Sequence, residues 1–235
     1  MIDRLHRPAG LIFDLDGTLV DTVSARIAGW VEALVAAGIP ASPERIAQRI
    51  GMDGRRLARE MAAAAARQLS EAETETIDQA AGAAFDRRNL RPTPLPGVAD
   101  ALAAIEAAGL PWVIATSSRK EQVTVSVAAL GLATAPVIVD GSHVEHAKPA
   151  PDLLLLAAKR LGVEPVRCWA IGDSTWDMRA TVAAGMTAIG VTAGSAVSAK
   201  ELTEAGASTV LATLAELALL LRDAPAGTWP GAITR

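Results

Sequence analysis

The chain has 235 residues, of which 51% are hydrophobic and 20% are charged, and its formal net charge is −4. This composition is typical of a globular protein that forms one large domain or one domain with an insertion. The acidic balance and the lack of a long basic run argue against nucleic acid as a partner. A single cysteine, Cys168, excludes an internal disulfide, and its apolar neighbours predict a buried structural thiol.

No segment of the sequence predicts a membrane association. The longest apolar stretch, 211–221, is shorter than the roughly 20 residues that span a bilayer, and it contains Glu216. Residues 1–7 lack the apolar run of a signal peptide. We therefore expect a cytoplasmic protein with no membrane partner, either a monomer or a homodimer.

The first predicted strand is the apolar run Leu11-Ile12-Phe13, which ends at the polar sequence Asp14-Leu15-Asp16-Gly17-Thr18. From residue 22 to about residue 89, apolar residues recur at helical spacing and no strand is convincing. We expect Asp21 to cap the first helix of this block. The proline-rich segment 91–97 predicts a linker.

After the linker, predicted helices and strands alternate. This pattern predicts an α/β fold, a Rossmann-like parallel sheet with helices on both faces, and an all-helical insertion after the first strand. We expect residues 1–20 and 91–235 to form the sheet domain and residues 21–90 to form the insertion. The predicted helices are 98–108, 120–130, 152–161 and 176–184, the strands between them are 112–115, 137–139, 166–171 and 187–191, and a last unit covers 199–210 with a helix near 214–221.

Four aspartates follow predicted strands, where ligands bind in a parallel sheet. Asp14 and Asp16 are two residues apart, so their side chains project to the same side of an extended chain. Asp173 and Asp177 are four apart, which places them on one face of a helix. Clustered carboxylates without His or Cys indicate Mg²⁺. The alternative is four solvated surface acids, which the flanking apolar strands argue against.

Four short motifs together resemble those of the haloacid dehalogenase-like (HAD) hydrolase superfamily. Residues 14–18 match its DxDGT motif, Thr116 follows the second predicted strand, Lys148 precedes a proline-rich helix start, and residues 172–177 match GDxxxD. The helical insertion lies where the cap of the C1 subclass lies, so the resemblance covers nearly the whole chain. Phosphoglycolate phosphatases are the nearest analogy within this subclass.

The resemblance implies a role for each aspartate. Asp14 would be the nucleophile that forms an aspartyl-phosphate, and its other oxygen would bind Mg²⁺. Asp16 would protonate the leaving oxygen and later deprotonate water, and its backbone carbonyl would bind the metal. Asp173 would be a metal ligand, and Asp177 would bind the metal or a metal-bound water.

The resemblance also implies a phosphate-binding set. Thr116 would hydrogen-bond a phosphoryl oxygen, together with backbone N–H groups near Asp16, Gly17 and Ser117. Lys148 would offset the negative charge of the nucleophile and the phosphate.

The helical insertion would act as a cap that chooses the leaving group. Its arginines would suit an anionic group such as a carboxylate or a second phosphate, although a solvated helix face explains each arginine singly. The loop 51–54 resembles the cap loop that dips into the site. The candidate contacts are Arg26, Arg49, Asp53, Arg55 and Arg56.

The sequence therefore predicts a Mg²⁺-dependent phosphatase that acts on a small-molecule phosphomonoester, of the phosphoglycolate type or a sugar phosphate. A β-phosphoglucomutase-like phosphomutase is the alternative, but such mutases carry a histidine where Arg26 aligns. A haloacid dehalogenase would lack an acid at the position of Asp16. A catalytically silent interaction module is the remaining hypothesis, and the complete set of catalytic residue types does not favour it.

Overall fold

The computed structural model describes residues 5–118 and 120–223, which include a parallel sheet of six strands. Their order across the sheet is β3-β2-β1-β4-β5-β6, the order of a doubly wound α/β fold. The sheet confirms the predicted Rossmann-like core. The strands are β1 (Gly10–Phe13), β2 (Trp112–Thr116), β3 (Ile138–Asp140), β4 (Cys168–Gly172), β5 (Thr187–Val191) and β6 (Thr209–Leu211).

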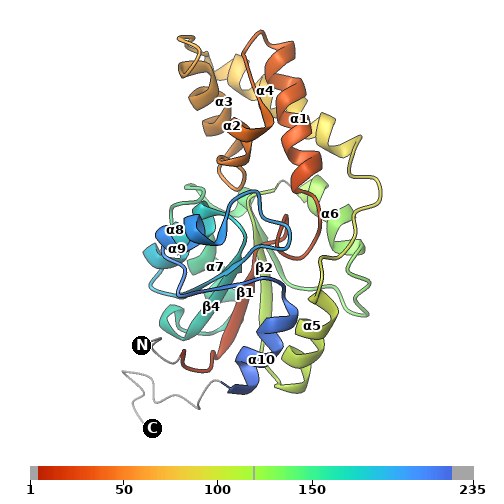
Figure 1. Cartoon of the computed structure of the whole chain (residues 1–235), viewed down its shortest axis with the longest axis vertical. Helices are drawn as coiled ribbons and strands as arrows, with labels where there is room; N and C mark the ends of the chain where they lie inside the picture. The colour runs from red at the N-terminus through yellow and green to blue at the C-terminus, as the bar shows by residue number, and fades with distance from the viewer. Residues whose placement is uncertain (1–4, 119, 224–235) are drawn as a thin grey trace.

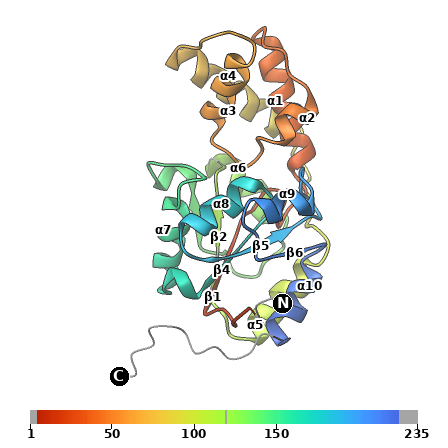
Figure 2. The ribbon, with the colours of Figure 1, turned by 60° about the vertical axis from the view of Figure 1, so that its left-hand side comes forward.

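Helices cover both faces of the sheet (Figures 1 and 2). Alternate residues of β1 belong to different apolar layers: Leu11 and Phe13 pack on one face and Ile12 packs on the other. Because both faces are buried, every residue of β1 and β4 is buried, as expected for a central parallel strand. One face carries α5 (Val98–Ala107), α6 (Lys120–Ala128) and α10 (Ala215–Asp223); the other carries α7 (Asp152–Leu161), α8 (Thr175–Ala183) and α9 (Ala199–Glu204).

The segment between β1 and α5 forms a helical cap with its own apolar core, above the carboxyl ends of the strands (Figure 1). Trp30 and Leu34 are buried in that core. The all-helical insertion is thus confirmed, while its exact limits at residues 21 and 90 stay a prediction. Its helices are α1 (Val23–Ala36), α2 (Pro43–Ala47), α3 (Gly54–Ala63) and α4 (Glu71–Asp86).

The two connections between cap and core run side by side. The N–H of Asp21 donates to the carbonyl of Thr93 at 2.9 Å, and the N–H of Leu95 donates to the carbonyl of Leu19 at 3.0 Å. An antiparallel bridge joins Val20 to the second connection. The cap is therefore attached through a paired hinge next to the Asp14–Thr18 loop.

Two details differ from the sequence predictions. The prediction that Asp21 caps α1 was wrong, because the N-cap is Thr22 and Asp21 is exposed. Thr22 makes no side-chain capping bond, because its hydroxyl donates to Asp16 instead. Strand β4 begins at Cys168 because a short 3-10 helix led by Pro165 precedes it.

Cys168 is buried, as predicted, and burial raises the pKa of its thiol to about 11. None of the described helices is long and apolar enough to cross a membrane.

Candidate active site

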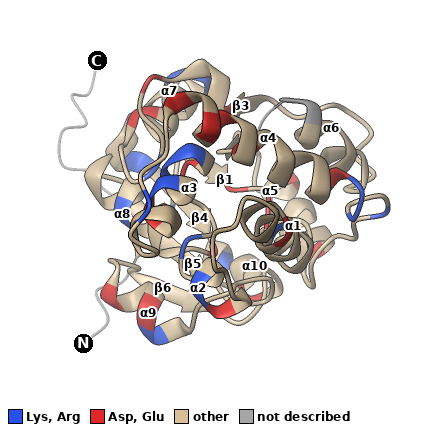
Figure 3. Ribbon diagram, turned by 90° about the horizontal axis from the view of Figure 1, so that it is seen from above, with Lys and Arg blue, Asp and Glu red and all other residues tan. Residues whose placement is uncertain are grey.

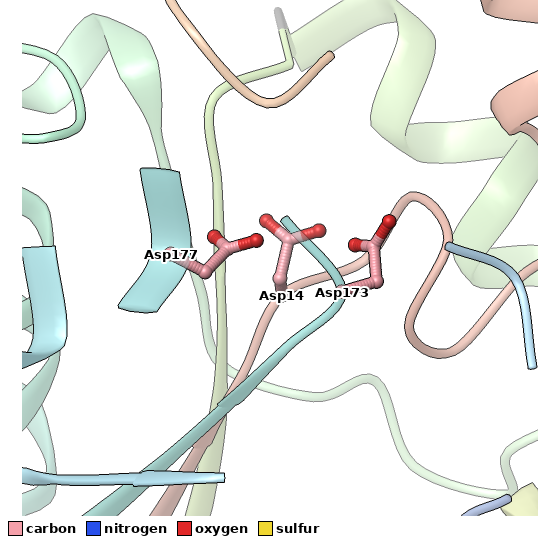
Figure 4. Close-up of side chains that lie close together, drawn as sticks. All are labelled: Asp14, Asp173 and Asp177. Atoms are coloured by element: carbon pink, nitrogen blue, oxygen red, sulfur yellow. The ribbon is translucent and has the colours of Figure 1, made fainter. Parts of the chain in front are cut away.

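Three carboxylates meet at the point where the strand order reverses. Asp14 follows β1, Asp173 follows the neighbouring strand β4, and Asp177 lies in the first turn of α8. Their nearest oxygens all lie within 4.8 Å of one another. Figure 4 shows the three carboxyl groups side by side, with Asp14 between the other two. This crevice is where doubly wound sheets bind their ligands.

Lys148 is the cation within this cluster. Its side chain is almost fully buried, and its Nζ lies 2.6 Å from an oxygen of Asp14 and 2.6 Å from an oxygen of Asp177. Nζ also donates to the carbonyl of Ala115 at 3.4 Å. Burial alone would lower the pKa of Lys148, but the charges of the two aspartates outweigh it and raise the pKa, so this lysine is charged.

One lysine does not balance three buried carboxylates. Burial raises the pKa of Asp14 to about 7, and the charge of Asp177 adds to this effect against the opposing charge of Lys148. Burial, with the charges of Asp177 and Asp14, also raises the pKa of Asp173. Carboxylates that resist ionisation in this way bind a hard divalent cation well, because the cation supplies the missing positive charge. The donor set thus fits Mg²⁺.

Asp177 also shapes the chain around it. One of its oxygens pairs with Lys148, and the other accepts from the N–H of Ser174 at 3.0 Å and from its hydroxyl. The hydroxyl of Ser174 in turn accepts from the N–H of Asp177, which completes a capping box at the start of α8. Both oxygens of Asp177 are therefore engaged within the protein.

Asp16 faces a different set of partners. The hydroxyl of Thr22 donates to its Oδ1 at 2.7 Å, while Nη2 of Arg26 lies 2.9 Å from its Oδ2 and the Ser118 hydroxyl donates to the same oxygen. Burial would raise the pKa of Asp16, but Arg26 and the two hydroxyl donors outweigh it and lower the pKa. Asp16 is thus held ionised and lies outside the Asp14–Asp173–Asp177 cluster. The sequence places Ser118 at the polar end of strand β2, after Thr116 and Ser117, but sequence reasoning gave it no role in the site.

The predicted phosphate-binding hydroxyls lie at the end of β2, on the wall of the cavity described below. Thr116 is buried, and its Oγ1 accepts from the N–H of Ser118 at 3.1 Å, which leaves its hydroxyl hydrogen for another acceptor. Ser117 reaches the cap, where its hydroxyl donates to the carbonyl of Gly51 at 3.5 Å.

Gly17 matters to the site because it has no side chain. Its N–H donates to the carbonyl of Val20 at 2.9 Å, so this donor is engaged within the loop. Its φ is +84°, and a Cβ at this position would lie 2.4 Å from an oxygen of Asp173. The glycine lets the Asp14–Thr18 loop approach Asp173, and the hydroxyl of Thr18 donates to the same carboxylate at 3.1 Å.

A cavity of about 720 Å³ lies between the carboxylates and the cap, large enough for a small organic ester. In Figure 3, which shows the ribbon from above, basic and acidic residues are interspersed along the elements of the cap and the core. The core wall of the cavity includes Asp14, Asp16, Thr116, Ser117 and Asp173, and its cap wall includes Arg26, Trp30, Arg49, Asp53 and Arg55.

Most of the predicted cap contacts have other partners in the cap. Arg49 donates to the carbonyl of Arg45 at 2.8 Å and lies 3.3 Å from Glu60. Arg55 is half-exposed and lies 3.8 Å from Glu75. The carboxylate of Asp53 accepts from the N–H of Arg56 and so caps α3. The side chain of Arg56 pairs with Glu60 at 2.9 Å.

Trp176 joins the core to the cap. It belongs to α8, yet its ring packs in the apolar core of the cap, and its Nε1–H donates to the carbonyl of Gln48 at 3.4 Å. The guanidinium carbons of Arg56 and Arg179 lie 5.0 and 5.2 Å from the centre of an indole ring. Sequence reasoning used this residue only to mark a helix start. A large aromatic residue beside an acidic motif was the available signal.

Comparison with known proteins identifies the family of this chain. The model of the haloacid dehalogenase-like hydrolases matches residues 8–185. This chain belongs to the haloacid dehalogenase-like hydrolase family. The phosphoglycolate phosphatase of Escherichia coli strain K12 is 35% identical to this HAD-like hydrolase over 206 residues, which cover 79% of this chain and 81% of that protein.

Solved structures share the fold. A hydrolase from Pseudomonas syringae superposes with a TM-score of 0.86 and 34% identity, covering 92% of this chain and 98% of the other. A β-phosphoglucomutase from Clostridium difficile superposes with a TM-score of 0.78 and 22% identity, covering 89% of this chain and 93% of the other. At that identity the second match shows the fold alone.

Proposed function

We propose that this HAD-like hydrolase is a Mg²⁺-dependent phosphatase that cleaves a small-molecule phosphomonoester through an aspartyl-phosphate. The carrying observation is the cluster of Asp14, Asp173 and Asp177 around the buried Lys148, at the bottom of a cavity roofed by the cap. The phosphoglycolate phosphatases among its relatives make 2-phosphoglycolate the first substrate to test, with sugar phosphates second.

Asp14 and Asp173 would hold the metal through carboxylate oxygens, with the backbone carbonyl of Asp16. Asp177 would contribute through a water molecule, because Lys148 and Ser174 engage both of its oxygens. When bound, Mg²⁺ supplies positive charge that offsets the charge of the nucleophile and of the phosphoryl group.

The protein groups divide the reaction into two displacements. An oxygen of Asp14 attacks phosphorus, the bond from phosphorus to the ester oxygen breaks, and the leaving oxygen takes a proton from Asp16. A water molecule then gives a proton to Asp16 and attacks phosphorus, which releases inorganic phosphate and restores Asp14. Lys148 holds the Asp14 carboxylate in place, and the free hydroxyl hydrogen of Thr116 binds a phosphoryl oxygen.

The pairing of Asp16 sets a requirement on the first displacement. Arg26 and two hydroxyl donors hold Asp16 ionised in the substrate-free site, the form that accepts a proton from water. An acid that protonates the leaving oxygen must carry a proton itself. Withdrawal of Arg26 from Asp16 when substrate binds would favour this proton, because the charge of Arg26 is the main influence that lowers the pKa of Asp16.

The test is phosphate release from a panel of 2-phosphoglycolate, glucose phosphates and ethyl phosphate, with Mg²⁺ and with a chelator. We expect release that needs Mg²⁺ and that disappears in Asp14→Asn. The variant Asp16→Asn should still bind Mg²⁺ but lose most turnover. Undiminished turnover in folded Asp14→Asn would overturn the mechanism. Conversion of glucose 1-phosphate to glucose 6-phosphate without phosphate release would identify a mutase instead.

A further inference from the structure

Arg26 bridges the cap and the catalytic aspartates. It lies on α1 of the cap, and its Nη2 lies 2.9 Å from Oδ2 of Asp16 and 2.9 Å from the Ser118 hydroxyl. We propose that Arg26 is the specificity-determining residue that binds a carboxylate of the leaving group and so selects phosphoesters of small 2-hydroxy acids. This inference rests on the proposed phosphatase function and deepens it.

The position of Arg26 matches the size of such a leaving group. Under the proposed mechanism, Asp16 touches the ester oxygen, and Arg26 is one hydrogen bond away from Asp16. In a 2-hydroxy acid a single carbon separates the ester oxygen from the carboxylate. A cation that binds this carboxylate must therefore lie beside the general acid, where Arg26 lies.

The guanidinium is fixed in orientation and retains hydrogen-bonding capacity. Its carbon lies 3.9 Å from the centre of the Phe85 ring, and the side chain is 15% exposed. Its Nε is buried and has no hydrogen-bond partner among the described residues. A held guanidinium with an unused donor suits a carboxylate, which accepts two parallel N–H bonds.

Among the described residues, the other two arginines of the cavity wall fit this role less well. Arg49 is engaged by Glu60 and by a backbone carbonyl, and Arg55 is half-exposed near Glu75. In the substrate-free site Arg26 is paired with Asp16. If Arg26 leaves Asp16, the Thr22 and Ser118 hydroxyls still donate to Asp16. The substrate carboxylate can thus replace Asp16 as the partner of Arg26 while Asp16 stays in position.

The experiment compares 2-phosphoglycolate with ethyl phosphate, in which a methyl group replaces the carboxylate. The ratio of their kcat/KM values is measured for the wild type, Arg26→Gln and Arg26→Lys, with the exposed Arg59→Gln as a matched control. We expect the wild type to prefer 2-phosphoglycolate and Arg26→Gln to reduce that ratio about 10- to 100-fold, the effect of a charge-assisted hydrogen bond. Arg26→Lys should restore part of the ratio, and the Arg59→Gln control should keep it.

A binding measurement separates this inference from the proposed function. The affinities of both esters for Asp14→Asn, in the presence of Mg²⁺, are compared with those for the double variant Asp14→Asn/Arg26→Gln. Selective loss of 2-phosphoglycolate binding would support the role of Arg26 even if the wild type released no phosphate, a result that would overturn only the function. Two results would overturn the inference. One is a kcat/KM ratio in Arg26→Gln equal to that of the wild type, and the other is equal kcat/KM values for both esters in the wild type.

Discussion

Replacement of the buried lysine tests the electrostatic design of the site. In Lys148→Met the side chain keeps nearly the same length but loses its charge, so the Asp14 and Asp177 oxygens that lie 2.6 Å from Nζ lose their cation. Removing one partner of a buried ion pair costs about 3–5 kcal/mol, because the remaining charge stays buried. For a chain of this size, that loss lowers Tm by about 6–20 °C.

The loss of folding stability in Lys148→Met must depend on pH in a defined direction. The pKa of Asp14 is raised to about 7, so its carboxylate is charged, and paired with Lys148, only above about pH 7. The contribution of the Lys148–Asp14 pair is therefore fully present at pH 8 and shrinks as the pH falls through 7. Lys148→Met should cost more stability at pH 8 than at pH 6.

Thermal unfolding of the metal-free protein, followed by circular dichroism at pH 6 and pH 8, measures both effects. The control is Lys159→Met, at an exposed position on α7, which should change Tm by less than about 2 °C. Added Mg²⁺ should recover part of the loss, because its charge replaces that of the ammonium. A Tm at pH 8 equal to that of the control would refute the reasoning.

Two further predictions concern the metal site. Burial and the charge of Asp177 raise the pKa of Asp14 to about 7, so a proton competes with Mg²⁺ for this carboxylate below that pH. Calorimetric titration should show the Mg²⁺ affinity falling by up to about tenfold per pH unit below pH 7. Equal Mg²⁺ affinities at pH 6 and pH 8 would contradict this prediction. Gly17→Ala should abolish Mg²⁺ binding, because its Cβ would lie 2.4 Å from an Asp173 oxygen, and should also cost about 1–2 kcal/mol of backbone strain. Gly109→Ala, with a similar φ of +63° and no atom within 4 Å of its Cβ, should show the strain alone.

Most of the fold could be predicted because each local pattern agrees with the global arrangement. The buried strand at 11–13, the helical block and the later alternation define a parallel sheet with an insertion. Element ends were less accurate, as at β4, where a 3-10 turn led by Pro165 delays the strand.

The clustering of the aspartates could be predicted for a similar reason, since Asp14 and Asp173 follow strands whose carboxyl ends meet at one edge of the sheet. The partners of Asp16 could not. Arg26 and Ser118 reach it from the cap and from the end of β2, so the contact depends on how the cap sits on the core. No periodicity in one segment determines that orientation. Trp176 escaped prediction for the same reason, because its apolar partners belong to the other domain.

The position of Trp176 supplies the enzyme with an optical reporter. Its indole ring packs in the apolar core of the cap, within about 5 Å of two guanidinium groups, and Trp176 is 8% exposed. If the cap lifts, this ring enters water while Trp112 and Trp169 keep their surroundings within the sheet domain. The emission of Trp176, compared with that of a Trp176→Phe variant, would therefore follow cap opening in real time during turnover, without an attached dye.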